Sequence, residues 1–356
     1  MLGEKPTIKE IHLGEGTPTF FSVENLEDLI NPIFAHASKT KNYEFSFEGH
    51  PKNTSYKHLQ KLYDLCFRPV SFGVQDYSEK VQKAIHRLQP FHNVAKVTFW
   101  ARETGYTYIG HHIIFGLPFQ EIKNVIDTIE KTKSLQPDRL AFYSYAHAPW
   151  IKENGKRGLN DENIPKDDKK RILYEIGKKL LHKNGYYKIG MDHFALETNT
   201  LYKAFHDGTL YRNFKVYSSS KTQLMIGLGV SSISDSWYSF AQNVKNLEDY
   251  QMLEWDKLPV FRGHLLTIED LIIRKHVLNL MCQFEPSWEN KADYFNEIPD
   301  VLIQLKEMEN DELIFIKDDG IIITEKRKPF VRNICMAFDL RLKRKAPETA
   351  LFFMTI

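Results

Sequence analysis

Short apolar runs alternate with longer segments of helical periodicity through the first half of the chain. The apolar runs are rich in β-branched and aromatic residues, and they predict five strands, at residues 8–13, 43–47, 69–74, 106–115 and 139–145. Between them, apolar positions recur at helical spacing, for example over Leu26–Ala37 and Ile122–Ile129. Pro32 lies inside the first of these helices and is expected to kink or restart it. Strands that are joined through helices indicate a parallel sheet.

The strands show no evident reversal of order, which favours a curved, barrel-like sheet over a doubly wound one. In either architecture, ligands bind at the carboxyl ends of the strands, where the connecting loops meet. Polar residues follow four of the five strands: Gly14–Thr19, Glu48, Gln75-Asp76 and Tyr145–His147. We therefore expect these residues to converge on one site.

The second half of the chain has a different pattern of predicted strands and helices. Residues 186–195 predict a sixth strand, with Asp192-His193 at its end. Beyond residue 243 helical patterns dominate, and Thr267 with Asp270 forms the signature of a helix capping box. Two apolar runs flank Asp318-Asp319-Gly320, which is a strong hairpin signal. The sequence thus predicts a barrel domain over residues 1–243 and a mainly helical, winged-helix-like domain over residues 244–356.

Composition narrows the class of protein. The chain has 356 residues, of which 42% are hydrophobic and 26% charged, as in an ordinary globular protein. A formal net charge of +2 argues against binding to nucleic acid or to a membrane surface. No apolar run approaches the roughly 20 residues of a membrane span, and the first residues do not form a signal peptide, so we expect a cytoplasmic protein.

Three cysteines, Cys66, Cys282 and Cys335, lie far apart in the sequence. This distribution fits a reducing compartment without a disulfide framework. The apolar neighbours of these cysteines predict that they are small buried side chains, and their separation predicts no metal site.

Several strings in the chain resemble one enzyme family. They are GEGTPT at 14–19, SFGVQD at 71–76, FGLP at 115–118, GMDHFA at 190–195, RNF at 212–214, GLGVS at 227–231 and RNICMAFD at 332–339. Together they resemble the oxygen-independent coproporphyrinogen III oxidases, which belong to the radical S-adenosylmethionine superfamily. The resemblance covers nearly the whole chain.

The resemblance implies a partial barrel of six β/α units, a 4Fe-4S cluster and two bound S-adenosylmethionine molecules. In this family the cluster reduces one S-adenosylmethionine to release a 5′-deoxyadenosyl radical. The radical abstracts hydrogen from propionate groups of coproporphyrinogen III, and loss of CO₂ leaves the two vinyl groups of protoporphyrinogen IX in haem biosynthesis. An electron-donor protein and a monomeric state are also implied.

The resemblance also assigns cofactor-binding residues, although it assigns no catalytic residue. Contacts to the first S-adenosylmethionine fall on Glu15, Glu48 and Ile233, and contacts to the second fall on Gly16, Thr17, Gln75, Arg87, His112 and Ala146. The residue types suit this ligand, because its ammonium, sulfonium and hydroxyl groups need carboxylate or amide acceptors, and its carboxylate needs Arg or backbone N–H donors.

The chain departs from the family at three places. The cluster-binding cysteines and the first barrel strand would precede residue 1, and none of the three cysteines present can replace them, so we expect the chain alone to bind no cluster and to be incomplete or inactive. Glu15 stands where the family has glycine, and His112 stands where the family has an acid. Because His111 and His112 are adjacent on a strand, only one of them can face the site.

Two alternatives remain open. The chain could be a non-catalytic descendant that binds a porphyrin or S-adenosylmethionine. A metallohydrolase site of His111, His112, His147 and His193 is also conceivable, but no His-x-His or carboxylate spacing supports it.

Overall fold

The computed structural model describes residues 5–146, 161–214, 216–254 and 256–345. Contacts divide the chain into two compact units: unit 1 runs to Tyr202 and unit 2 begins at Lys203. Each unit is described by itself. The domain boundary predicted at residue 243 falls inside unit 2, at the end of a strand, and stays a prediction.

Unit 1 is built on a seven-stranded sheet of order β1-β2-β3-β4-β5-β7-β6. Its strands are β1 (Thr7–Leu13), β2 (Ser38–Gly49), β3 (Pro69–Gln75), β4 (Tyr108–Phe115), β5 (Arg139–Ser144), β6 (Tyr187–Ile189) and β7 (His193–Ala195). The first five strands pair in parallel with their sequence neighbours. The five predicted strands and their unreversed order are therefore confirmed.

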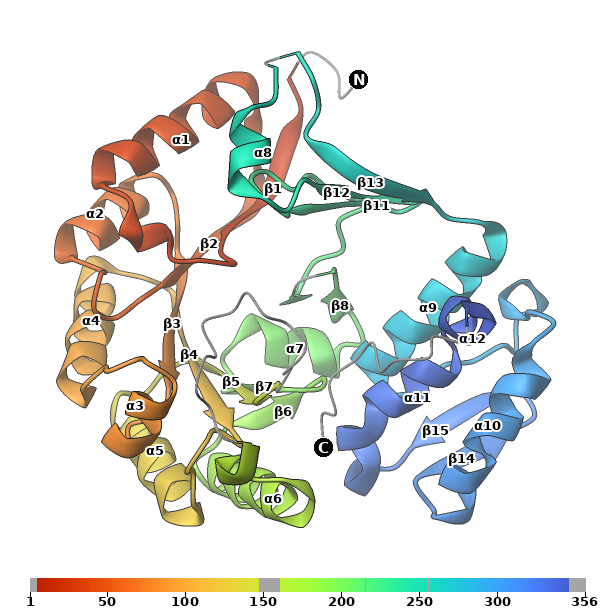
Figure 1. Cartoon of the computed structure of the whole chain (residues 1–356). Helices are drawn as coiled ribbons and strands as arrows, with labels where there is room; N and C mark the ends of the chain where they lie inside the picture. The colour runs from red at the N-terminus through yellow and green to blue at the C-terminus, as the bar shows by residue number, and fades with distance from the viewer. Residues whose placement is uncertain (1–4, 147–160, 215, 255, 346–356) are drawn as a thin grey trace. The chain divides into compact units, whose positions relative to one another are not determined.

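Helices cover the outer side of this curved sheet (Figure 1). They are α1 (Val23–His36), α2 (Tyr56–Asp64), α3 (Glu79–Ala84), α4 (Phe91–Thr104), α5 (Ile122–Ser134) and α6 (Asp167–Lys183). Helix α1 continues through Pro32, so the expected restart is wrong. The buried side chains of Leu26 and Ile30 anchor the helix on the sheet, and this packing outweighs the single backbone hydrogen bond that proline removes.

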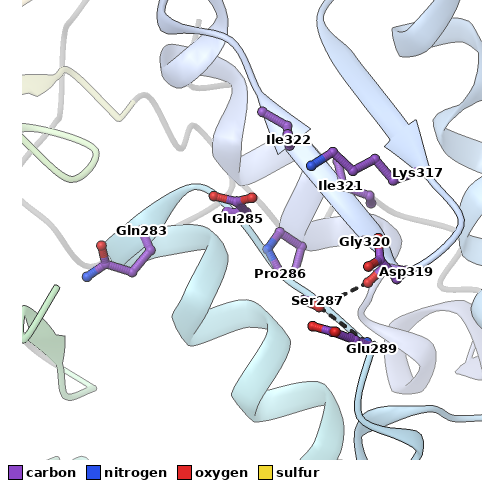
Figure 2. A pocket seen from close by; sticks show the side chains of 10 residues that line it. All are labelled: Gln283, Glu285, Pro286, Ser287, Glu289, Lys317, Asp319, Gly320, Ile321 and Ile322. Carbon is purple, nitrogen blue, oxygen red and sulfur yellow. Dashed lines mark hydrogen bonds between the residues drawn. The ribbon is translucent and has the colours of Figure 1, made fainter.

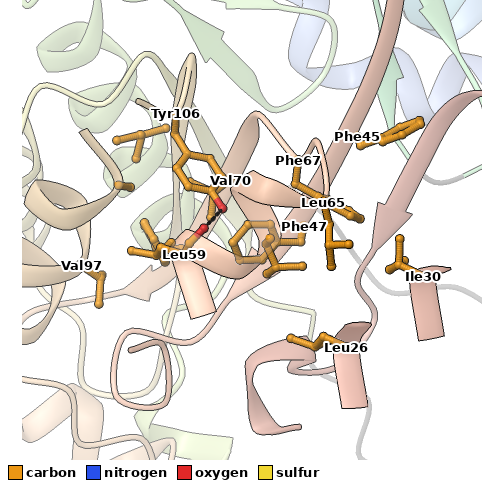
Figure 3. Close-up of a cluster of buried hydrophobic side chains, with 14 residues drawn as sticks. Leu26, Ile30, Phe45, Phe47, Leu59, Leu65, Phe67, Val70, Val97 and Tyr106 are labelled. Atoms are coloured by element: carbon orange, nitrogen blue, oxygen red, sulfur yellow. Dashed lines mark hydrogen bonds between the residues drawn. The ribbon is translucent and has the colours of Figure 1, made fainter. Parts of the chain in front are cut away.

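The main core of unit 1 lies between the sheet and these helices. Figure 3 shows that it includes Phe45 and Phe47 of β2, Val70 of β3 and Leu59 of α2, all at most 3% exposed. The buried Tyr106 donates a hydrogen bond from its hydroxyl to the carbonyl of Leu59. Alternate residues of each strand thus supply the apolar outer face, and the residues between them point to the opposite, inner face.

The prediction of one continuous sixth strand over residues 186–195 is wrong. Residues 187–195 form a hairpin, in which β6 and β7 pair antiparallel and β7 also pairs antiparallel with β5. Gly190 turns the chain with φ of +59°, a conformation that glycine adopts at little cost. Asp192 therefore lies in the turn and His193 begins β7, so neither residue ends a strand.

Unit 2 combines antiparallel strands with helices. Its strands are β8 (Tyr211–Arg212), β9 (Tyr217–Ser218), β10 (Leu224–Met225), β11 (Ile233–Ser236), β12 (Ser239–Asn243), β13 (Val260–Leu265), β14 (Ile314–Lys317) and β15 (Gly320–Ile323). Its helices are α8 (Leu247–Gln251), α9 (Ile268–Gln283), α10 (Ile298–Asn310), α11 (Val331–Ala337) and α12 (Leu340–Lys345), while α7 (Thr200–His206) spans the boundary between the units.

Two local predictions for unit 2 are confirmed. Thr267 caps α9 in a capping box with Asp270, and β14 and β15 form a hairpin around Asp318-Asp319. The four-stranded antiparallel sheet β10-β11-β12-β13 was not predicted as such. Its last strand, β13, has every residue exposed and so lacks the apolar run that marks the buried strands.

No helix in the described ranges is both long and apolar enough to cross a membrane. The helix α6 has 17 residues and carries charged side chains along its length.

Candidate functional site

The inner face of the unit 1 sheet is polar. On β1 and β2, a hydrogen bond of 2.9 Å joins His12 Nδ1 and Ser46 Oγ, and His12 Nε2 lies 3.7 Å from Glu48 Oε1. On β4 and β5, the rings of His112 and Tyr143 meet edge to face with their centroids 5.7 Å apart. A parallel sheet with an apolar outer face and a polar inner face can hold a polar ligand against the inner face.

The glycine loop after β1 is fixed to the end of β2. Thr54 donates a hydrogen bond from its hydroxyl to Thr19 Oγ1, and the backbone N–H of His50 donates to the same atom. A Cβ atom added at Gly16 would meet no atom within 4 Å, so the loop leaves open space there. A Cβ at Gly14 would lie 2.4 Å from His12 Nε2 and 3.2 Å from Glu48 Cδ. The absence of a side chain at residue 14 therefore lets His12 and Glu48 occupy the inner face.

Glu15 adopts the left-handed conformation, with φ of +63°. A non-glycine residue in this region is disfavoured by about 1 kcal/mol or more. The exposed Glu15 thus occupies a backbone position that suits glycine, the residue that the family resemblance expected here. Its contact with a cofactor stays a prediction.

Gln75 and Arg87 lie at the carboxyl end of β3. Arg87 donates from Nη2 to the carbonyl of Gly73 at 3.0 Å. Within the described residues, Arg87 Nε and Gln75 Oε1 are buried and have no hydrogen-bond partner. Burial lowers the pKa of the Arg87 guanidinium from its usual value. A Cβ at Gly73 would lie 2.6 Å from Arg87 Nη2 and 2.8 Å from Gln75 Nε2, so both side chains pack over the bare glycine.

Orphaned polar atoms of this kind are uncommon in native structures, because burying them without a partner costs free energy. Arg87 Nε can donate a hydrogen bond and Gln75 Oε1 can accept one, so the two atoms suit a ligand that offers both an acceptor and a donor. This pair is the clearest sign of a binding site on the inner face.

His112 is neutral near pH 7. Burial is the main cause that lowers the pKa of the imidazole to about 4. The nearby Glu48 opposes this shift in pKa, and His193, His12 and Arg87 add to it. The inner face therefore carries a neutral imidazole at the position where the family resemblance expects an acid.

His111 points to the other face of the sheet, as expected from its adjacency to His112. A hydrogen bond of 3.0 Å joins His111 Nε2 and Thr98 Oγ1 of α4, and burial lowers the pKa of this imidazole to about 3. His147 lies outside the described residues. Among the residues that are described, no three His, Cys, Asp or Glu side chains lie together in a way that could hold a metal ion, so the hydrolase alternative gains no support.

The remaining predicted site residues are only partly placed. Ala146 follows β5, where the N–H of Tyr145 donates to the carbonyl of Phe115. Thr17 precedes the short helical turn Pro18–Phe20. Ile233 begins β11 in unit 2. The structure brings Glu48, Gln75, Arg87 and His112 to the inner face of unit 1, and the cofactor contacts of all these residues stay predictions.

Sequence reasoning missed His12, Ser46 and Tyr143. The signal was present, since polar residues alternate with apolar ones along both strands: Glu10 and His12 on β1, and Glu44, Ser46 and Glu48 on β2. A period of two marks a strand with one polar face.

The three cysteines do not form one cluster among the described residues. Cys282 and Cys335 are buried as predicted, and burial raises the pKa of each thiol to about 12. Cys66 is only half-buried, so the prediction of burial is wrong there, because its left-handed backbone (φ of +73°) places it at a helix end beside Lys39 Nζ, which is 2.9 Å from its sulfur.

A hollow of about 370 Å³ opens in unit 2, between the end of α9 and the β14–β15 hairpin (Figure 2). Inside it, Ser287 donates from its hydroxyl to the carbonyl of Asp319 and accepts from the N–H of Glu289. Its lining includes three acidic side chains and none of the predicted cofactor residues.

Comparison with known proteins finds relatives that share one name. No protein-family model matches the chain. The oxygen-independent coproporphyrinogen III oxidase of Helicobacter pylori is 36% identical over 345 residues, which cover 94% of this chain and 75% of the relative. The Escherichia coli protein of the same name is 33% identical over 348 residues, covering 95% and 75% of the two chains.

A solved structure agrees. The coproporphyrinogen III oxidase of Escherichia coli, described as a radical SAM enzyme, superposes with a TM-score of 0.89 at 31% identity, covering 95% of this chain and 79% of that one. The likeness extends over both units of the chain.

Proposed function

The chain belongs to the oxygen-independent coproporphyrinogen III oxidase family, and from this premise we propose that its inner-face site binds S-adenosylmethionine for the oxidation of coproporphyrinogen III. The observation that carries the proposal is the pair of buried, unpartnered atoms Arg87 Nε and Gln75 Oε1 within the described residues. Arg87 suits the carboxylate of the ligand, and Gln75 suits one of its ammonium or hydroxyl donors.

The other groups on the inner face fit the same ligand. The Glu48 carboxylate attracts a sulfonium or ammonium group, and the open space at Gly16 allows a ligand to approach the backbone of the loop. The neutral His112 offers one ring nitrogen as donor and the other as acceptor. When bound, S-adenosylmethionine supplies the hydrogen-abstracting group that acts on the propionates of the porphyrinogen.

Two S-adenosylmethionine molecules form part of the proposal. Glu15, Glu48 and Ile233 would contact the first, and Gly16, Thr17, Gln75, Arg87, His112 and Ala146 would contact the second. An electron-donor protein, a monomeric state and a cytoplasmic location are proposed on the same family grounds.

The 4Fe-4S cluster does not fit the described residues. Such clusters are held by cysteine thiolates that lie together. Cys282 and Cys335 are buried thiols of high pKa, Cys66 contacts Lys39, and the described part of the chain contains no cluster of three potential ligands.

The second candidate function is the alternative that the sequence left open, in which the chain binds S-adenosylmethionine or a porphyrin without catalysis. Two measurements separate the candidates. Equilibrium dialysis with S-adenosylmethionine is expected to show saturable binding in either case. Anaerobic turnover of coproporphyrinogen III, assayed with a reductant and with iron and sulfide supplied, is expected only from the enzyme. Absence of saturable binding would rule out the enzyme and a descendant that binds S-adenosylmethionine, and it would leave only a porphyrin binder.

A further inference from the structure

Gln75 is held in an unusual backbone conformation. Its φ is +66°, and the N–H of Asp76 donates to the carbonyl of Val74 at 2.9 Å, which closes a tight three-residue turn around Gln75. A turn of this kind is strained for a residue with a side chain. Contacts with neighbouring residues must therefore hold Gln75 in this conformation. Its Oε1 is buried and has no hydrogen-bond partner within the described residues.

The next residue, Asp76, fastens the turn. Its side chain is fully buried. One carboxylate oxygen accepts from the N–H of Ser78 at 2.6 Å, and the other accepts from Gln120 Nε2 at 2.7 Å. The carbonyl of Asp76 accepts from Gln82 Nε2 at 2.7 Å. Three hydrogen bonds from three segments therefore fix the residue that follows Gln75.

Gln120 connects this turn to the end of β4. Its Oε1 accepts from the N–H groups of Gly116 and Leu117, and its Nε2 donates to the carbonyl of Ile114 as well as to Asp76. These bonds fix which end of the amide faces Asp76. The Asp76–Gln120 pair thus ties together the strands that carry Gln75 and His112.

The same network reaches Arg87. Gln82 exchanges hydrogen bonds with the backbone of Gln89, accepting from its N–H and donating to its carbonyl. Gln89 Nε2 then donates to the carbonyl of Gly73, the same atom that accepts from Arg87. The loop that carries Arg87 is therefore held at both ends by groups bonded to Asp76 or to Gly73.

We propose that Asp76 is a positioning residue, whose ionised carboxylate holds Gln75 and Arg87 in the conformation that binds S-adenosylmethionine. This inference rests on the proposed function. It adds that the binding site is set by a buried carboxylate that does not itself need to touch the ligand.

The charge state of Asp76 can change within an accessible pH range. Burial, together with repulsion from Asp127 of α5, raises the pKa of this carboxyl to about 6, while hydrogen bonds from Gln120, Ser78 and Thr128 oppose the rise. A protonated carboxyl accepts hydrogen bonds less well and needs an acceptor for its own O–H. Affinity for S-adenosylmethionine should therefore fall as the pH drops through about 6.

Several charged groups on the neighbouring helices have partners of their own. On α3, Lys83 pairs with Glu79, and Lys80 lies over the ring of Phe119. On α5, Lys131 pairs with Asp127. The pH response is accordingly assigned to Asp76.

The test compares Asp76→Asn with the wild-type chain. The substitution preserves shape but leaves one oxygen for two donors, so an N–H₂ group must face either the N–H of Ser78 or Gln120 Nε2. Gln120 cannot rotate without losing Gly116 and Leu117. We expect about tenfold weaker binding of S-adenosylmethionine at pH 8 in equilibrium dialysis, since a lost charge-assisted hydrogen bond is typically worth that factor or more. We expect the melting temperature to stay within about 4 °C, because the variant no longer buries a charge.

A matched control and a rescue complete the design. Asp127→Asn removes an exposed carboxylate from the same neighbourhood and should leave the affinity at pH 8 unchanged. Combining Asp76→Asn with Gln120→Glu restores a donor opposite an acceptor between residues 76 and 120 but loses the bond to the Ile114 carbonyl, so it should recover only part of the lost affinity. The affinity of wild type should fall below about pH 6, whereas that of Asp76→Asn should not follow this titration.

The possible outcomes are distinct. If wild type binds S-adenosylmethionine and Asp76→Asn binds equally well, the inference is overturned and the proposed function stands. If Asp76→Asn loses affinity only together with a large fall in melting temperature, and the double variant shows no rescue, Asp76 has a merely structural role and the inference is again overturned. If wild type shows no binding, the proposed function fails and the inference fails with it.

Discussion

The imidazole of His12 lies 3.7 Å from the carboxylate of Glu48, across the parallel pair β1–β2. Its other ring nitrogen is hydrogen-bonded to Ser46, so the ring is held between two residues of the neighbouring strand. A ring fixed in this way orients the Glu48 carboxylate, the group that we assign to the positively charged part of S-adenosylmethionine.

Replacing His12 by Ala should therefore weaken S-adenosylmethionine binding by about fivefold, because a partly exposed contact between an imidazole and a carboxylate contributes up to about 1 kcal/mol. His36→Ala, at the exposed end of α1, removes an imidazole remote from this contact and serves as control. Dialysis with radiolabelled ligand measures both. Equal affinities for the two variants would show that His12 does not contribute to S-adenosylmethionine binding.

Gly14 and Gly16 provide a second comparison. An added methyl at Gly14 collides with His12 and Glu48, whereas one at Gly16 meets no protein atom within 4 Å. Gly14→Ala should lower the free energy of unfolding by about 1–3 kcal/mol, as overpacking does. Gly16→Ala should leave stability unchanged but weaken S-adenosylmethionine binding, because the open space is assigned to the ligand. A Gly16→Ala chain that binds normally would show that the ligand lies elsewhere.

Replacing Glu15 by glycine should make the fold more stable. Its φ of +63° disfavours any side chain, so Glu15→Gly should raise the free energy of unfolding by about 1 kcal/mol. Glu15→Ala keeps the strain while removing the charge, and it should not stabilise. Urea denaturation distinguishes the two variants. If both stabilise equally, the charge rather than the backbone is responsible.

Much of unit 1 follows from local pattern, since the strand predicted at 69–74 is observed as Pro69–Gln75 and the one at 139–145 as Arg139–Ser144. Strand β2, however, begins at Ser38, well before the apolar run at 43. Its polar start pairs with β1 through Thr7 and Ser38, and that pairing depends on tertiary structure.

The candidate site, too, could be predicted from the sequence only in part. Glu48 and Gln75 could be identified from their places at strand ends, because parallel strands bring their carboxyl ends together, whereas His112 was assigned only through the family resemblance. The γ-turn at Gln75 and the link from Asp76 to Gln120 join segments distant in sequence and have no local signature. The hairpin at residues 187–195 was missed because one turn at Gly190 reverses a segment whose pattern predicts a single strand.

Asp270 makes unit 2 sensitive to acid. Its carboxylate accepts from Arg341 Nε at 2.7 Å and from the N–H of Thr267 at 2.8 Å, and these contacts, Arg341 first, lower the pKa of Asp270 well below its usual 3.8. A lowered pKa stabilises the fold above the unfolded-state value, and this stabilisation is lost as the pH falls below it.

Asp270→Asn should therefore reduce the free energy of unfolding by about 1–2 kcal/mol at pH 7, the range typical of a lost helix cap. The difference from wild type should shrink as the pH is lowered from about 4 toward 2. Urea denaturation at several pH values provides the measurement. A difference that does not change with pH would mean that shape, rather than charge, holds the capping box.

Equilibrium dialysis of the purified chain with radiolabelled ligand shows whether the inner face of unit 1 binds S-adenosylmethionine. Arg87→Ala serves as the site variant, and Arg262→Ala, an exposed arginine in unit 2, serves as the control for loss of charge. The account predicts saturable binding by wild type and Arg262→Ala, and at least about tenfold weaker binding by Arg87→Ala, as expected for a lost charge-assisted hydrogen bond. Binding that is absent from wild type, or that is undiminished in Arg87→Ala, would contradict it.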